Sequence, residues 1–185
     1  MIDVRNKICR GYKGECPVRT YISNVCDYCM ACDPNENRRK RYKRHEEAFF
    51  AYIKDKLDVH KREFRVSFDQ NETSKKYARI DGIVFGDGII VCLEVDEDGH
   101  QNYECDQYRM HLVTGELLQK YPGCVVSWIR VNPTTDENSQ WSKKSKAIRE
   151  KRFEDVIKET RAILETCDTR VVYIGFTKFA CFEEL

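Results

Sequence analysis

Two groups of side chains in this 185-residue chain have the chemistry to bind metal ions. Five of the ten cysteines fall within the first 32 residues, and several acidic residues gather on a predicted β-hairpin near the middle of the chain. Thiolates are soft ligands that favour zinc, whereas carboxylate oxygens favour hard cations such as Mg²⁺ or Mn²⁺. The two groups therefore predict two different kinds of metal site.

The N-terminal cysteines predict a structural zinc site. Cys26 and Cys29 have the Cys-x2-Cys spacing of a metal knuckle, and Cys9 and Cys16 supply two further thiolates. Four thiolates leave no open coordination position, so such a site is structural. Cys32 is the alternate ligand, because the last three cysteines with one upstream cysteine form a competing set. A segment this short has no hydrophobic core of its own and needs a metal to fold.

The hairpin predicts a carboxylate pair. If Asp87-Gly88 forms the two-residue turn, Gly86 pairs with Ile89, and counting outward sets Asp81 opposite Glu94. Opposed residues have Cβ atoms about 4.5–5.5 Å apart, so two carboxylates there repel each other unless a cation lies between them. Asp81 and Glu94 are therefore the predicted Mg²⁺ ligands. In the alternative interpretation Asp81 only caps a strand end, and a one-residue register slip would abolish the pair.

Three more residues are catalytic candidates near this pair. Glu46 lies on the apolar stripe of a predicted helix, although an acid at a helix start also interacts favourably with the helix dipole. Asp96 shares the face of Glu94, with a salt bridge to Arg79 as the alternative. His100 follows four residues later and is a candidate general base, because imidazole titrates near neutral pH.

The hydrophobic pattern predicts the elements that must position these side chains. Helices are expected at 46–57, 104–120 and 144–165, and strands at 63–69, 78–85, 89–96, 124–131 and 170–176. This order predicts an α/β fold with a mixed sheet (α+β in character). We expect a cysteine-rich zinc module at 1–35, a basic linker at 36–45 and the main domain at 46–185.

The distribution of charge predicts local contacts with a polyanion. Thirty-two basic and 31 acidic residues nearly cancel, but residues 38–44 contain six basic side chains in seven positions. Such a run binds phosphates in a salt-dependent manner, and it can equally be a solvated surface or a localisation signal. The candidate DNA contacts in this run are Arg38, Arg39, Arg41, Lys43 and Arg44.

The sequence also predicts a compartment. It contains no apolar run of about 20 residues and no apolar region at the N-terminus, so we expect neither a membrane span nor secretion. An intracellular location, in the cytoplasm or nucleus, would keep the cysteines reduced and available to zinc.

Three motifs together resemble a known family. Glu94–His100 reads Glu-Val-Asp-Glu-Asp-Gly-His, residues 105–110 read Cys-Asp-Gln-Tyr-Arg-Met, and residues 128–133 read Trp-Ile-Arg-Val-Asn-Pro. In this order they resemble the restriction-endonuclease-like PD-(D/E)xK superfamily, in its branch akin to very-short-patch-repair endonucleases that is common in large DNA viruses. Members of that branch carry a Cys-rich N-terminal segment and a basic run. The resemblance spans roughly residues 9–176.

The resemblance implies an αβββαβ core and a metal-dependent DNA endonuclease. It implies that Glu46 is the helix acid, that Asp81 and Glu94 bind the metal, and that Asp96 and His100 complete the active site. Arg109, Arg130 and Asn132 would lie around it and contact nucleic acid. Asp96 stands where the wider superfamily has a lysine, and Arg-Ile-Asp replaces Arg-Pro-Asp, so His100 is the residue expected to orient the attacking water.

Two other functions fit the same sequence. One is an inactive nuclease fold that binds DNA, or RNA, through its zinc module and basic residues. The other is a zinc-stabilised assembly factor whose acidic residues form salt bridges. A homodimer is a further expectation for the nuclease, because cutting both strands commonly needs two active sites.

Overall fold

A computed structural model of the chain describes residues 7–12, 14–16, 21–22, 26–35, 43–68, 76–97, 103–134 and 143–176. The chain forms two compact units, Met1–Arg44 and His45–Leu185. Their boundary falls inside the predicted basic linker at 36–45.

The described residues of the first unit contain little regular structure. Two short strands, β1 (Lys7–Ile8) and β2 (Tyr21–Ile22), pair antiparallel. Its buried cluster contains Cys9, Cys16 and Cys29 beside one aliphatic residue, Ile22. Cysteines thus occupy the positions that aliphatic side chains fill in an ordinary core, as expected of a module that depends on a metal.

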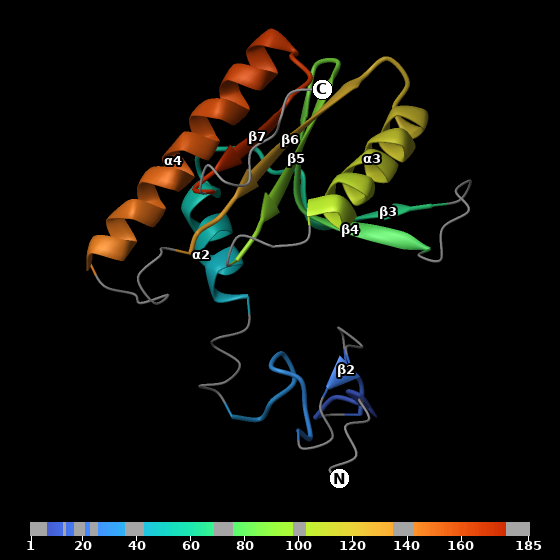
Figure 1. Cartoon of the computed structure of the whole chain (residues 1–185), viewed down its shortest axis with the longest axis vertical. Helices are drawn as coiled ribbons and strands as arrows, with labels where there is room; N and C mark the ends of the chain where they lie inside the picture. Colours follow the sequence, from blue (N-terminus) through green and yellow to red (C-terminus); the bar gives the residue numbers. More distant parts are fainter. Residues whose placement is uncertain are drawn as a thin grey trace. The chain divides into compact units, whose positions relative to one another are not determined.

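The second unit is built around a five-stranded mixed sheet (Figure 1). Its elements are α2 (Arg44–Ile53), β3 (Lys61–Ser67), β4 (Tyr77–Gly86), β5 (Ile89–Val95), α3 (Tyr103–Lys120), β6 (Val125–Val131), α4 (Lys143–Thr166) and β7 (Val171–Ile174). In the sheet order β3-β4-β5-β6-β7, the first three strands are antiparallel neighbours and the last three are parallel. The predicted mixed α/β fold, with the element order αβββαβ, is confirmed.

The predicted register of the central hairpin is also confirmed. Gly86 pairs with Ile89, and the ladder continues to Gly82 opposite Leu93. Gly88 has a φ of 71°, a backbone conformation that glycine adopts at little cost, which explains why Asp-Gly occupies the turn.

Helices cover the sheet on both faces, with α3 on one side and α4 on the other (Figure 1). Phe49 and Phe50 of α2 join Phe153 of α4 in one hydrophobic cluster. Met110 and Val113 of α3 belong to a second cluster. Successive β5 residues alternate between the two clusters and are buried in both, which explains the continuous apolar run of that strand.

In β3 and β4 the regular alternation of side chains between the two faces of the sheet is interrupted at one position along the strands. Ile80 and Ile83 both face the α3 cluster although they are three residues apart, whereas Val84 faces the other cluster. In β3 the matching position is Glu63, which lies between the paired residues Arg62 and Phe64 and has a φ of 49°. A positive φ is strained for a residue with a side chain. Because Arg62 pairs with Gly82 and Phe64 with Ile80, Glu63 and Asp81 lie at the same level of neighbouring strands.

Gly82 lets α2 approach β4 closely at this level. A Cβ at position 82 would lie 2.6 Å from Cε1 and 2.8 Å from Cζ of the Phe50 ring. Phe50 is packed in the core and cannot move aside freely. A glycine next to Asp81 therefore sets how near the α2 acids come to the sheet.

We expect Gly82→Ala to lower the free energy of unfolding by about 1–3 kcal/mol, because the added methyl group overpacks the Phe50 contact. Urea unfolding followed by circular dichroism measures the loss. Gly115→Ala is the matched control, because a Cβ there meets nothing within 4 Å. Since Gly115 lies inside α3, that control should be neutral or stabilising. Equal effects of the two substitutions would contradict the packing argument.

Candidate metal centres and the buried charges around them

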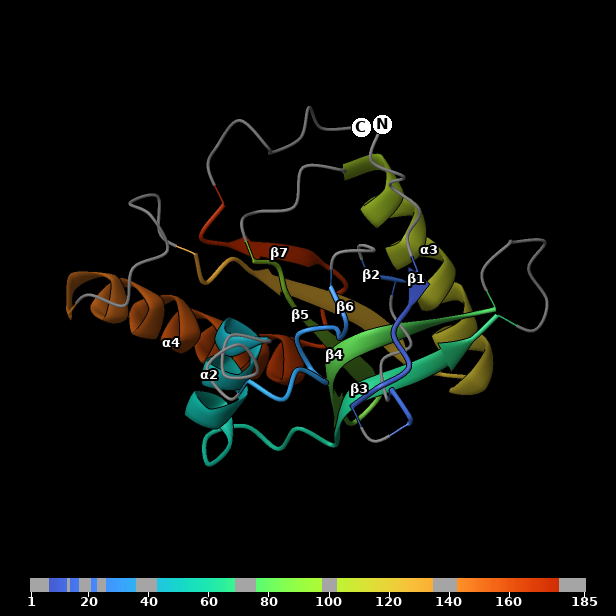
Figure 2. The same ribbon diagram turned by 90° about the horizontal axis from the view of Figure 1, so that it is seen from below.

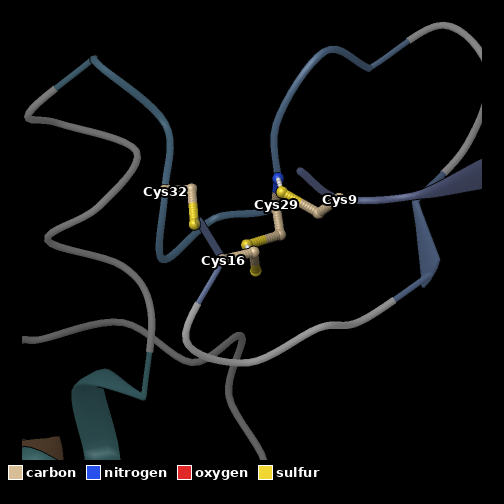
Figure 3. A group of neighbouring side chains, drawn as sticks. All are labelled: Cys9, Cys16, Cys29 and Cys32. Atoms are coloured by element: carbon tan, nitrogen blue, oxygen red, sulfur yellow. Dashed lines mark hydrogen bonds between the residues drawn. The ribbon is translucent and has the colours of Figure 1, made fainter. Parts of the chain in front are cut away.

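Four cysteines of the first unit could hold a metal ion (Figure 3). Each of Cys9, Cys16, Cys29 and Cys32 offers a sulfur atom, and these atoms all lie within 4.8 Å of one another. The Sγ atoms of Cys16 and Cys29 are 3.7 Å apart. Among the described cysteines Cys26 is not part of this group, so the prediction of Cys26 as the fourth ligand is wrong, and the alternate Cys32 takes its place.

A tight turn explains this exchange. The N–H groups of Cys32 and Asp33 both donate to the carbonyl oxygen of Cys29, at 3.0 and 2.9 Å. The turn brings the Cys29 and Cys32 side chains together, so the knuckle is Cys29-x2-Cys32. The sulfur of Cys9 accepts hydrogen bonds from the N–H groups of Gly11, at 3.4 Å, and Cys29, at 3.2 Å.

Two thiols of this group, those of Cys29 and Cys32, resist ionisation. Burial, followed by hydrogen bonds with Cys16 and Cys29, raises the pKa of Cys32 to about 12. Burial also raises the pKa of Cys29. A metal ion that binds here must displace these protons and supply the positive charge that stabilises crowded thiolates.

The two possible metal knuckles, Cys26-x2-Cys29 and Cys29-x2-Cys32, predict different effects when a single cysteine is replaced. We expect Cys32→Ser to lose the bound metal and Cys26→Ser to retain about one equivalent, because only the Cys32 sulfur lies in the group. Elemental analysis of the purified variants, with titration of free thiols before and after a chelator, measures this. Loss of metal in Cys26→Ser alone would contradict the assignment.

A second group lies in the other unit and consists of carboxylates. Glu46 of α2, Glu63 of β3 and Asp81 of β4 each offer an oxygen, and these oxygens all lie within 4.8 Å of one another. Glu46 is buried and the other two are partly buried. The sequence predicts Glu46 and Asp81 in one site, but it does not predict Glu63.

Asp81 lies where the sheet divides. The ladder between β4 and β5 reaches only Gly82 and Leu93, whereas β5 continues beside β6 as far as Val95. In the space between the diverging strands, Asp81 Oδ2 accepts a hydrogen bond from the Val95 N–H at 2.8 Å. The carboxylate thus closes this fork in the sheet.

Glu94 does not share a site with Asp81 in the way the sequence predicts. Its oxygens accept hydrogen bonds from both terminal nitrogens of Arg109 in α3, at 3.2 and 2.9 Å. Glu94 lies outside the three-carboxylate group, and this corrects the predicted Mg²⁺ pair. Burial and then the charge of Asp81 raise the pKa of Glu94 to about 8, although Arg109 acts in the opposite direction.

Asp96 and Arg130 form a buried ionic cluster. Arg130 donates two hydrogen bonds of 2.7 Å to Asp96 and a third of 2.9 Å to Asp106. The Arg130 side chain is only 4% exposed, so it cannot contact a nucleic acid, and that prediction is wrong. The pairing also corrects the suggested Asp96–Arg79 salt bridge and gives Asp96 a structural role.

The remaining predicted residues have varied surroundings. Arg109 is occupied by Glu94 and by the carbonyl oxygen of Arg79, and Asn132 Oδ1 accepts from the Thr134 N–H at 2.8 Å. Lys43 immediately precedes α2, and Arg44 begins it and is exposed. Their contacts with nucleic acid stay predictions. The other candidates lie outside the described residues: His100, Arg38, Arg39 and Arg41.

Comparisons with known proteins give no family for this chain. No protein-family model matches it, and no curated protein or solved structure matches it either. Within the described ranges, none of the helices is both long enough and apolar enough to cross a membrane. The assignment of a function therefore depends on the site itself.

The raised pKa of Glu94 predicts how stability depends on pH. Folding shifts this carboxyl from its ordinary pKa of 4.5 to about 8, so the folded chain favours the protonated form. Its contribution is full below about pH 4.5 and is lost as pH rises towards 8. Without added divalent cations, wild type should lose at least about 1 kcal/mol between about pH 5.5 and pH 7.5.

Glu94→Gln should flatten this slope, because an amide does not titrate. Urea unfolding at the two pH values measures the difference, and Glu165→Gln, at an exposed position near the end of α4, is the control. The slope of Glu94→Gln, rather than its absolute stability, is the readout, because the substitution also alters the hydrogen bonds with Arg109. Parallel slopes for wild type and Glu94→Gln would contradict the prediction.

Proposed function

We propose that this chain is a divalent-metal-dependent endonuclease that hydrolyses DNA phosphodiester bonds. One observation carries the proposal: carboxylates from three different elements, Glu46, Glu63 and Asp81, converge within 4.8 Å at the fork of a mixed sheet. Mg²⁺ and Mn²⁺ are held in proteins by a few such oxygens and complete their coordination with water and substrate phosphate. The donor set therefore fits a catalytic cation of this class.

The charge balance around the group supports a cation. Arg62 donates to Glu46 at 3.1 Å but also serves Glu47, at 2.6 and 3.1 Å. Arg79 reaches Glu63 only at 3.9 Å. Carboxylates as close as those of Glu46, Glu63 and Asp81 repel each other, and a cation between them would relieve that repulsion.

The strained backbone at Glu63 supports a functional role for that residue. Its φ of 49° lies in a region that costs a non-glycine residue on the order of 1–3 kcal/mol. Such strain persists where the surrounding structure holds it, and it gathers at ligand sites. Here it turns a third acid towards Glu46 and Asp81.

The residues of the chain would divide the chemical work. Asp81 and Glu63, from adjacent strands, and Glu46, from the buried face of α2, would hold the cation. When bound, the cation supplies Lewis-acid polarisation of a phosphoryl oxygen. A carboxylate of the group that is not used in binding can orient an attacking water and accept its proton.

Membership of the restriction-endonuclease-like superfamily and structural zinc are part of the same proposal. The element order αβββαβ agrees with the core that the sequence resemblance implies. Four cysteines with no fifth donor in the group suit a closed tetrahedral zinc site better than a catalytic one. The zinc would stabilise the first unit, which has little hydrophobic core.

A second candidate function has its own support. Three of the predicted catalytic acids, Glu46, Glu94 and Asp96, each contact an arginine: Arg62, Arg109 and Arg130 respectively. Acids that are already paired can serve the fold alone. The same chain would then be a nuclease-fold protein that binds nucleic acid without cleaving it.

Plasmid nicking in the presence of Mg²⁺ or Mn²⁺ tests the proposal. We expect wild type to nick supercoiled DNA only with a divalent cation. Glu63→Gln and Asp81→Asn should each reduce the rate at least about 100-fold, because each removes one charged ligand of the cation. Asp155→Asn, at an exposed position on α4, should cleave like wild type.

Mn²⁺ binding, measured by electron paramagnetic resonance, separates the two candidate functions. A nuclease requires Mn²⁺ binding that both Glu63→Gln and Asp81→Asn weaken. Nucleic-acid binding without nicking, together with Mn²⁺ binding that is equal in wild type, Glu63→Gln and Asp81→Asn, would favour the inactive fold and refute the endonuclease.

A further inference from the structure

The outer part of the β3–β4 hairpin carries two arginines in direct opposition. Arg65 and Arg79 are register partners across the antiparallel pair. Opposed side chains have Cβ atoms about 4.5–5.5 Å apart, and two like charges in that position destabilise a sheet. A compensating group is therefore expected on this face.

Within the described part of the chain the compensation is incomplete. The Arg65 guanidinium lies 4.2 Å from the centre of the Tyr77 ring, and that of Arg79 lies 5.8 Å from it. Arg79 also has Glu63 at 3.9 Å, whereas none of the described carboxylates forms a salt bridge with Arg65. Exposed cation–π contacts are worth only about 0.5–1 kcal/mol, so they orient the two guanidinium groups without neutralising them.

This face of the hairpin is open to solvent. Val66, Ala78 and Ile80 point to the other side, where they pack in the α3 cluster. Arg65 and Arg79 alternate with them and are exposed, and Tyr77 is 40% exposed. In both views β3 and β4 extend alongside α3 and away from α4 (Figures 1 and 2). We call Arg65, Tyr77 and Arg79 the arginine–tyrosine face.

We infer that the arginine–tyrosine face binds the sugar–phosphate backbone of a nucleic acid. A guanidinium presents several donors that match phosphate oxygens, and two opposed guanidiniums gain most from an anion that both can reach. Exposed arginine and aromatic side chains are the usual lining of nucleic-acid strand grooves. A bound phosphate would remove the repulsion that the fold leaves uncompensated.

The position of the face matches the proposed function. Arg65 and Arg79 lie two residues along their strands from Glu63 and Asp81, which is roughly 7 Å. A backbone held by the two arginines would pass directly to the three-carboxylate group. The choice of nucleic acid as the partner, and its delivery to the carboxylates, rest on the proposed function; the binding itself is measured without metal or cleavage.

Fluorescence anisotropy with a labelled single-stranded oligonucleotide, in buffer without divalent cations, tests the inference. We expect the double variant Arg65→Gln/Arg79→Gln to bind at least about 10-fold more weakly than wild type. Its plot of log affinity against log salt should be flatter by about 1.4, since each phosphate contact to a single strand contributes about 0.7.

The matched control removes the same charge elsewhere. Lys54→Gln/Lys158→Gln alters two exposed lysines, one in the turn that follows α2 and one on α4, and should keep the wild-type slope. Thermal unfolding checks that both double variants are folded. Equal weakening in the two variants would overturn the inference. Displacement of the oligonucleotide by polyglutamate of equal charge, at equal concentration, would also overturn it and indicate an acidic-peptide surface.

The outcome is separable from that of the nuclease. If the arginine variant nicks plasmid with an unchanged KM, this inference fails and the endonuclease stands. If wild type binds the oligonucleotide but never nicks plasmid, and binding is lost in the arginine variant but not in the lysine control, the endonuclease fails and the arginine–tyrosine face stands.

Discussion

The concentration of acidic side chains where β4 and β5 separate is the constraint on which the second unit depends. Burying a carboxylate is costly unless it is paired, and Glu46, Glu94 and Asp96 are all buried. Three arginines from three different elements form salt bridges with these acids: Arg62 of β3, Arg109 of α3 and Arg130 of β6. These pairs tie α2, α3 and the parallel strands to one region of the sheet. Glu63 and Asp81 are the two acids whose oxygens lie within 4.8 Å of one another and of a Glu46 oxygen.

Local backbone features build this region, and they act together. Gly82 admits the Phe50 ring, which brings α2 and its acid Glu46 against the sheet. Phe50 in turn carries the Arg62 guanidinium 4.4 Å above its ring, so the cation that serves Glu46 is positioned by the same contact. Asp81 closes the fork through the Val95 N–H, and the distortion at Glu63 brings the third carboxylate to the same level. A packing contact between α2 and β4 thus controls the electrostatics of the candidate site.

Features that local chemistry determines could be predicted from the sequence. Asp87-Gly88 defines its own turn, so the hairpin register could be counted, and the apolar stripe of α2 placed Glu46 on the buried side. Features that depend on non-local geometry could not be reached. Glu63 faces Asp81 across a long connection, so its register could not be counted. The Arg109 partner of Glu94 depends on how α3 lies over the sheet. Cys32 replaces Cys26 because of two backbone hydrogen bonds to Cys29 that no spacing rule specifies.

The buried Arg130 and the exposed pair Arg65 and Arg79 have different roles, and their surroundings distinguish them. Arg130 is enclosed by Asp96 and Asp106 and satisfies charges that the fold has already buried. Arg65 and Arg79 face each other on an open surface, where the described residues offset them with a tyrosine ring and one carboxylate at 3.9 Å. Buried pairs of the first kind stabilise a structure without requiring a ligand. An exposed like-charge pair of the second kind weakens a hairpin unless an anion offsets it, and the proposed anion would bind next to the cation proposed for the three-carboxylate group.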